Sequence, residues 1–205
     1  MGTKVQRAKT MNTAKSTAKK KLAHFRKPPK DYTISSEEEH IEKNRLDEAM
    51  TAYLPTLPAY VPQAPSDKKL QKKAAYDDFF ANKMLLTSAI KKGIPYSLFR
   101  EIQQNSPFSE IEWADFIGIS TKSLHRYKTA LDHYFKSVHS EKIIEMAEVI
   151  SVGLDVFGDM DKLKLWLITP NFALGESKPL ELLKDSYGKE LVLSALIRIN
   201  HGIFI

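Results

Sequence analysis

The chain has 205 residues, of which 42% are hydrophobic and 27% charged, a composition typical of a soluble globular protein with one or two domains. It contains no cysteine, which excludes disulfides, thiolate catalysis and cysteine-ligated zinc sites. No apolar run is long enough to cross a bilayer, and no apolar segment follows the N-terminal lysines, so we expect a cytoplasmic protein without a membrane span or secretory signal.

The net charge of +6 is distributed unevenly along the chain. Residues 1–30 hold ten of the 31 Lys and Arg residues and no acid, which leaves 21 basic residues against 25 acidic ones in the remainder. Because this segment is poor in large apolar residues, the sequence predicts a disordered basic tail over residues 1–34. The tail either adds salt-dependent affinity for DNA or is a solvated extension, native or artificial, and the sequence alone leaves both interpretations open.

A helix and a proline-rich linker are predicted over residues 35–65. Ser36 can cap a helix with three glutamates in its first turn, which predicts a helix from about 36 to 53. Four prolines then predict an extended, stiff linker and a domain boundary, namely Pro55, Pro58, Pro62 and Pro65.

The next predicted domain, residues 66–138, begins with a helix that Ser66 would cap and Gly93 would end. Its apolar residues recur at steps of three and four, namely Leu70, Ala74, Phe80, Met84, Leu85 and Ile90. From this helix onward every apolar period is near 3.6 residues and no convincing alternating run occurs. The predicted fold class is therefore all-α.

The stretch EIEWADFIGISTKSLHRYK has the spacing of a DNA-binding helix-turn-helix. Such a motif needs a small residue at the helix crossing, a glycine four positions later and an apolar residue six positions after that. Ala114, Gly118 and Leu124 meet these requirements, and Ser120 can cap the second helix. That helix would present residue types that contact phosphates and base edges, namely Lys122, Ser123, His125, Arg126 and Lys128.

Two observations favour a more ordinary interpretation of this stretch. Glu110, Glu112 and Asp115 on the first helix would repel phosphates, and two packed helices with a charged surface can show the same spacing. His125 has no His, Asp or Glu four residues away, so we expect a surface or groove residue rather than a metal ligand.

Residues 139–205 are predicted to form a small domain of four helices. Ser140 would cap the first, Asp159 or Asp161 would begin the second, and Lys178-Pro179 would begin the third. The last would run from about 188 to 201, where Gly202 suits a left-handed cap. Asn171 is expected to cap a turn. Most large apolar residues here are expected in the core, namely Trp166, Leu174, Pro179, Leu180, Val192 and Leu196.

The strings LHRYK, WLITPNFALGESKPLELL and YGKELVLSALIRINHGIFI resemble the Xre/MbcA/ParS-type antitoxins, and the resemblance covers about residues 84–205. It implies a helix-turn-helix domain that represses its own operon, followed by a domain that binds a toxin of the RES type, an NAD-consuming enzyme. It also implies that the C-terminal end blocks the toxin active site, through His201, Gly202, Ile203, Phe204 and Ile205.

The implied partners are the cognate RES-domain toxin, promoter DNA and further copies of this chain, since one helix-turn-helix reads too few base pairs unaided. The alternative is a helix-turn-helix transcriptional regulator without a toxin partner, which would have no need of an exposed apolar end. An enzyme is not expected, because the sequence lacks cysteine, a glycine-rich phosphate loop and a nucleophile elbow. No cofactor or metal is expected either.

Overall fold

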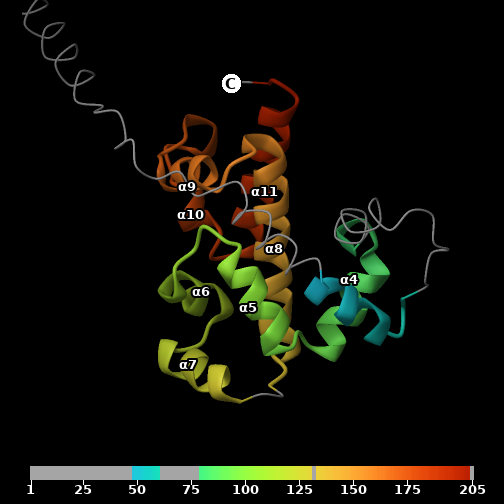
Figure 1. Ribbon diagram of the computed structural model, residues 1–205. Coiled ribbons are helices and arrows are strands. Elements are labelled where there is room, and N and C mark those ends of the chain that lie inside the picture. Colours follow the sequence, from blue (N-terminus) through green and yellow to red (C-terminus); the bar gives the residue numbers. More distant parts are fainter. Residues whose placement is uncertain (1–47, 61–78, 131–132, 204–205) are drawn as a thin grey trace, which may run out of the picture. The chain divides into compact units, whose positions relative to one another are not determined.

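The computed structural model describes residues 48–60, 79–130 and 133–203, which all belong to one compact unit. Helices and connecting loops make up these residues, with no strand among them, so the predicted all-α class is confirmed (Figure 1). The predicted basic tail over 1–34 lies outside them. Besides helical segments at 48–53 and 79–81, the elements are η1 (Leu54–Thr56), α4 (Lys83–Lys92), α5 (Tyr96–Gln104), α6 (Glu110–Ile117), α7 (Thr121–Thr129), α8 (Ser137–Phe157), α9 (Met160–Ile168), η2 (Phe172–Leu174), α10 (Pro179–Leu182) and α11 (Ser186–Asn200).

Polar caps define several helix starts, some of which the sequence predicted. At α6, the Ser109 hydroxyl accepts from the Glu112 N–H, and the Glu112 carboxylate accepts from the Ser109 N–H at 2.7 Å. Ser120 caps α7 and Asp159 caps α9, as predicted. Pro179 occupies the first turn of α10, where its missing N–H has no cost.

The long helix α8 is shared by the two halves of the described chain. It packs against α4 and α6 and also against α9 and α11 (Figure 1). Its fully buried Ile143, Met146 and Val149 belong to one continuous core cluster that reaches from Met50 to Leu196. The domain boundary predicted between residues 138 and 139 falls within this helix and stays a prediction.

An aromatic cluster holds α5 and α6 together. Trp113 is fully buried, and its ring lies edge-on to Phe99 and Phe108, with centroids 5.2 and 5.7 Å apart. Its indole N–H donates to the Ser106 hydroxyl at 2.8 Å, so the polar atom of this side chain is also satisfied. The cluster therefore fixes the start of the α6–α7 pair relative to the core.

The prediction that Ser140 caps a helix is wrong. Helix α8 begins at Ser137, so Ser140 lies inside it and is completely buried. Its hydroxyl accepts from the Ile94 N–H at 2.9 Å and donates to the Phe135 carbonyl oxygen at 3.1 Å. Ser140 satisfies two backbone groups that lie outside regular helices, a role that depends on tertiary contact and has no local signal.

The single helix predicted from Ser66 to Gly93 is also wrong in its described part. Asn82 interrupts it, because its side-chain oxygen accepts from the N–H groups of Met84 and Leu85 and starts α4 anew. Met84, which the predicted apolar stripe included, is 68% exposed, whereas its neighbour Leu85 is buried. Gly93 ends α4 as predicted, at a positive φ of 92°.

The first part of the predicted linker is not extended. Residues 54–56 form the 3-10 helix η1 with Pro55 in its first turn. Leu54, the first residue of η1, and Leu57, which follows it, are buried. Residues 61–78, which contain the later prolines, lie outside the described residues. The start of the proline-rich segment therefore contributes to the core.

Candidate functional site

Helices α6 and α7 meet at the three residues whose spacing suggested a helix-turn-helix. Ala114 and Leu124 are buried, and Gly118 takes the left-handed conformation that ends α6, with φ of 72°. The Gly118 N–H donates to the Asp115 carbonyl oxygen, and the Ile119 N–H donates to the Ala114 carbonyl oxygen, both across the turn. Glycine adopts this positive φ without strain because it has no Cβ. Gly118 therefore allows the sharp turn that sets the angle between α6 and α7.

Four of the five predicted DNA contacts lie exposed on α7, namely Lys122, His125, Arg126 and Lys128. Ser123 is only partly exposed, because it takes part in the helix cap. Its N–H donates to the Ser120 hydroxyl at 3.1 Å, and the two hydroxyls are 2.9 Å apart. The structure thus brings the cationic residues together on one short helix and ties Ser123 to that helix start.

Two of the three acids of α6 have hydrogen-bond or ion-pair partners. The carboxylate of Glu112 is occupied by the capping box at Ser109. Asp115 pairs with Lys184, whose ammonium lies 2.9 Å from the carboxylate and has its pKa raised by that hydrogen bond and charge. Of the three acids that argued against phosphate binding, Glu110 keeps its place at the open surface, where it lines a cleft with residues of α7.

Sequence reasoning missed two histidines, His133 in the segment after α7 and His139 in the first turn of α8. The His133 ring stacks on the Tyr127 ring, with centroids 3.6 Å apart and planes at 9°. Burial first, and then the charges of Arg126 and His139, lower the pKa of His133. Nδ1 of His139 donates to the carbonyl oxygen of Ile117 at 2.8 Å, which links α8 to the end of α6. No spacing in the sequence signals these contacts.

The C-terminal end of α11 has the geometry that the sequence predicted. The Gly202 N–H donates to the Ile199 carbonyl oxygen and the Ile203 N–H donates to the Arg198 carbonyl oxygen, both at 2.9 Å, with φ of 69° at Gly202. His201 and Gly202 are exposed, and Ile203 is 54% exposed, so Ile203 does not return to the core. Phe204 and Ile205 lie outside the described residues.

An apolar face that the sequence did not predict runs along α11. Tyr187 is 84% exposed and Leu191 is 55% exposed, and their step of four residues keeps them on one side of the helix. Ile197 is 49% exposed but lies six positions beyond Leu191, on another side of the helix. The core residues Val192 and Leu196 occupy the opposite side and are fully buried. The exposed apolar residues could have been found by noting that they are out of phase with the buried ones.

Helix α11 is held firmly against α8. The ammonium of Lys189 pairs with Glu148 at 2.9 Å, and Lys142 of α8 donates to Ser186 at 3.1 Å. Gly188 lies so close to the Leu182 carbonyl oxygen that any Cβ would overlap it. The exposed face and the end of the helix are thus carried on a rigid support.

The residues of the C-terminal strings that the sequence placed in the core or in a turn have those positions. Pro179, Val192 and Leu196 are buried, and partly buried residues pack against the same core, namely Trp166, Leu174 and Leu180. The Asn171 side chain accepts from the Ala173 N–H at 2.9 Å and caps η2.

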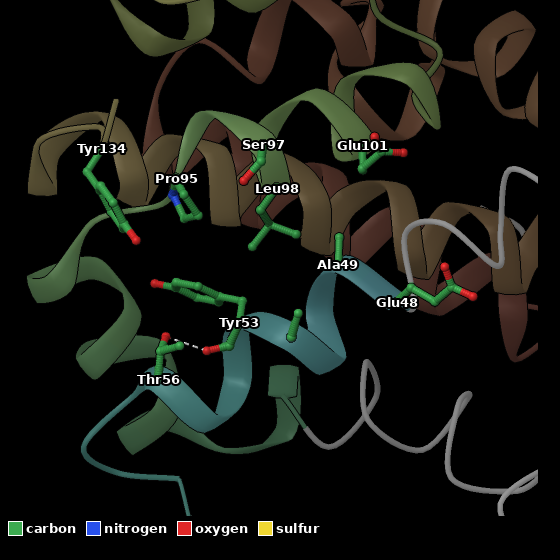
Figure 2. A pocket seen from close by; sticks show the side chains of 10 residues that line it. Glu48, Ala49, Tyr53, Thr56, Pro95, Ser97, Leu98, Glu101 and Tyr134 are labelled. Carbon is green, nitrogen blue, oxygen red and sulfur yellow. Dashed lines mark hydrogen bonds between the residues drawn. The ribbon is translucent and has the colours of Figure 1, made fainter. Parts of the chain in front are cut away.

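A separate cavity of about 460 Å³ lies between the helix at 48–53, which carries Tyr53, and α5, which carries Leu98 and Glu101 (Figure 2). The Tyr53 hydroxyl donates to the Gly93 carbonyl oxygen at 2.9 Å, and burial raises the pKa of Tyr53. One carboxylate oxygen of Glu101 is buried without a hydrogen-bond partner in the part of the chain that the structure describes. Sequence reasoning missed this cavity because its walls are about 40 positions apart.

Neither a metal centre nor a membrane span is found in these ranges. Within 48–60, 79–130 and 133–203, no three His, Asp or Glu side chains gather closely enough to hold a metal ion. No helix there is both long and apolar enough to cross a bilayer.

Comparison with known proteins places the C-terminal part in a described family. Residues 153–202 match the family of the antitoxin Xre/MbcA/ParS C-terminal toxin-binding domain. The chain is 31% identical over 121 residues to an Antitoxin Xre of Yersinia enterocolitica, a match that covers 58% of this chain and 81% of the relative. An Antitoxin Xre of Photorhabdus laumondii is 29% identical over 119 residues, covering 58% of this chain and 80% of the relative.

A solved structure is also similar to part of the chain. It is the M. tuberculosis MbcT-MbcA toxin-antitoxin complex, one chain of which matches with 22% identity and a TM-score of 0.45. The similarity covers 54% of this chain and 96% of the other.

Proposed function

Because this chain belongs to the family of Xre antitoxins, we propose that it inhibits a RES-type, NAD-consuming toxin by placing its C-terminal end in the toxin active site, and that it represses its own operon by binding promoter DNA. The observation that carries the first part is the exposed end of α11. Gly202 ends the helix in a defined conformation, and Ile203 continues from it without packing on the core.

The physical argument for the toxin contact is pre-organisation. The salt bridge of Lys189 with Glu148 and the close packing at Gly188 hold α11 in place, so its end loses little conformational freedom on binding. An NAD cleft is concave and partly apolar, which suits a short apolar end. The exposed Tyr187 and Leu191 on the same helix supply further apolar contact area outside the cleft.

The argument for DNA binding is the cationic surface of α7. Lys122, Arg126 and Lys128 are exposed together, and the capped turn at Gly118 holds α7 at a fixed angle to α6. Phosphate contacts of this kind make affinity strongly salt-dependent. Specific binding then requires a dimer or higher oligomer, because one such helix contacts only a few base pairs.

A growth assay tests the toxin contact. The neighbouring-gene toxin is co-expressed with the full chain, with a chain that ends at His201, and with Ile203→Asp. We expect the full chain to rescue growth and both variants to fail. Met84→Asp is the matched control, because Met84 is a comparably exposed apolar residue on α4, and it should rescue fully.

Folding of each variant is checked by circular dichroism and thermal unfolding. If folded Ile203→Asp and the truncated chain rescue as well as the full chain, the C-terminal end is not the inhibitory element. Neutralisation would then have to come from the helical surface.

DNA binding is tested separately with Lys122→Gln and Arg126→Gln. Both should weaken binding to the promoter fragment, lower the salt dependence of the affinity and leave growth rescue intact. Loss of rescue together with DNA binding in a folded variant would mean that the two activities do not reside in separate surfaces.

A further inference from the structure

Ile111 stands apart from the other apolar residues of α6. Trp113, Ala114, Phe116 and Ile117 of this helix are buried, whereas Ile111 is 73% exposed. It lies in the second position of the helix, next to the capping box, and contributes nothing to the core. A single exposed apolar residue is ordinary on a protein surface, so its meaning depends on what lies beside it.

An open cleft of about 440 Å³ adjoins Ile111. Its other walls are Glu110 from α6 and Thr121, Lys122 and His125 from α7. Two of these residues, Lys122 and His125, were predicted from the sequence as DNA contacts. The cleft therefore joins an apolar side chain of the first helix to the surface of α7 that faces DNA in the proposed function.

The negative charges beside the cleft favour contact with a neutral base edge over contact with a phosphate. Glu110 and Glu112 lie in the first turn of α6, and the Glu112 N–H is already bonded to Ser109. Acids in this position disfavour an anion at the helix start. A neutral base edge meets no such repulsion, and thymine is the base that presents a methyl group in the major groove.

We infer that Ile111 is a specificity-determining residue that contacts the 5-methyl group of a thymine when α7 lies in the major groove. This inference rests on the proposed DNA binding. Lys122 and His125 bring the duplex to the cleft, and the Ile111 side chain then covers the methyl group of one thymine in each half-site. Burial of one methyl group corresponds to about a fourfold gain in affinity per half-site.

The test begins with the full chain and a duplex enriched from a random pool. Each thymine of that duplex is replaced in turn by deoxyuridine, which removes only the methyl group and leaves the protein unchanged. We expect one thymine per half-site at which the replacement weakens binding by the wild-type chain about fourfold. Ile111→Ala removes the contact from both half-sites, so it should bind the thymine duplex about sixteenfold more weakly, and it should show no further loss at the same deoxyuridine.

Met84→Ala is the matched control, because it shortens an exposed apolar residue on α4, outside the cleft, and should keep the full thymine preference. If no thymine shows this coupling to Ile111 while Lys122→Gln still weakens binding, the inference fails and the proposed DNA binding stands. If the full chain enriches no duplex at all, both fail.

A protein contact at Ile111 is the other outcome to be separated. If Ile111→Ala changes the oligomeric state in sedimentation experiments without changing the thymine preference, the exposed side chain serves association between copies. That result would overturn the inference.

Discussion

Replacement of Ser140 by alanine should reduce the stability of the fold by an amount that the structure allows to be worked out. The Ile94 N–H would lose its acceptor, and the Phe135 carbonyl oxygen would lose a donor. A buried N–H left without a partner costs about 1–3 kcal/mol. Alanine in a helix interior regains roughly 0.5 kcal/mol over serine, so we expect a net loss of about 0.5–2.5 kcal/mol.

Urea unfolding followed by tryptophan fluorescence measures this loss, since the completely buried Trp113 reports on the same core. A loss of 2 kcal/mol corresponds to a thermal midpoint about 4–8 °C lower for a unit of this size. Ser137→Ala is the control, because Ser137 is exposed in the first turn of α8 and should change the free energy of unfolding little. A loss below about 0.5 kcal/mol in Ser140→Ala, with an unchanged denaturant slope, would refute the assigned hydrogen bonds.

Three further predictions concern the support of the proposed surfaces. Gly188→Ala should destabilise the fold by about 1–3 kcal/mol in urea unfolding, because the new Cβ would push α11 away from Leu182; an unchanged midpoint would contradict that packing. Lys184→Ala should weaken DNA binding in anisotropy titrations by leaving the Asp115 charge unpaired, without a measurable change in unfolding, whereas Lys184→Arg should behave as wild type. The pKa of the His133 ring, measured by NMR, should lie below 6.5. The unfolded chain then takes up the proton at a higher pH than the folded one, so the free energy of unfolding should fall as the pH drops through 6.5. A pKa at or above 6.5 would contradict the stacked, partly buried position of the ring.

Local features of this fold could be predicted because they depend on neighbours in the sequence. Ser120 and Gly202 act within one helical turn, so the residue type and its position were sufficient, whereas the sequence left Asp159 and Asp161 as alternatives and the structure selects Asp159. The spacing of Gly118 and Leu124 also located the α6–α7 turn correctly.

What could not be predicted depends on distant contacts. Ser140 resembles a helix cap in sequence, but its partners Ile94 and Phe135 are brought to it by packing. The exposure of Tyr187 and Ile111 depends on which side of each helix meets α8 and the aromatic cluster. Periodicity shows that a helix has two faces, but in a chain where both faces carry apolar residues it does not show which face is buried.

The shared helix α8 limits how this protein can be divided into fragments. The family match begins at Gly153, near the end of α8, yet the α8 residues that bond to α11 include Lys142 and Glu148, well before that point. A fragment cut at the start of the match would lose most of the helix against which α11 packs. The matched domain is therefore shorter than the unit whose core it shares, and point substitutions in the full chain are the sound way to assign activity to either half.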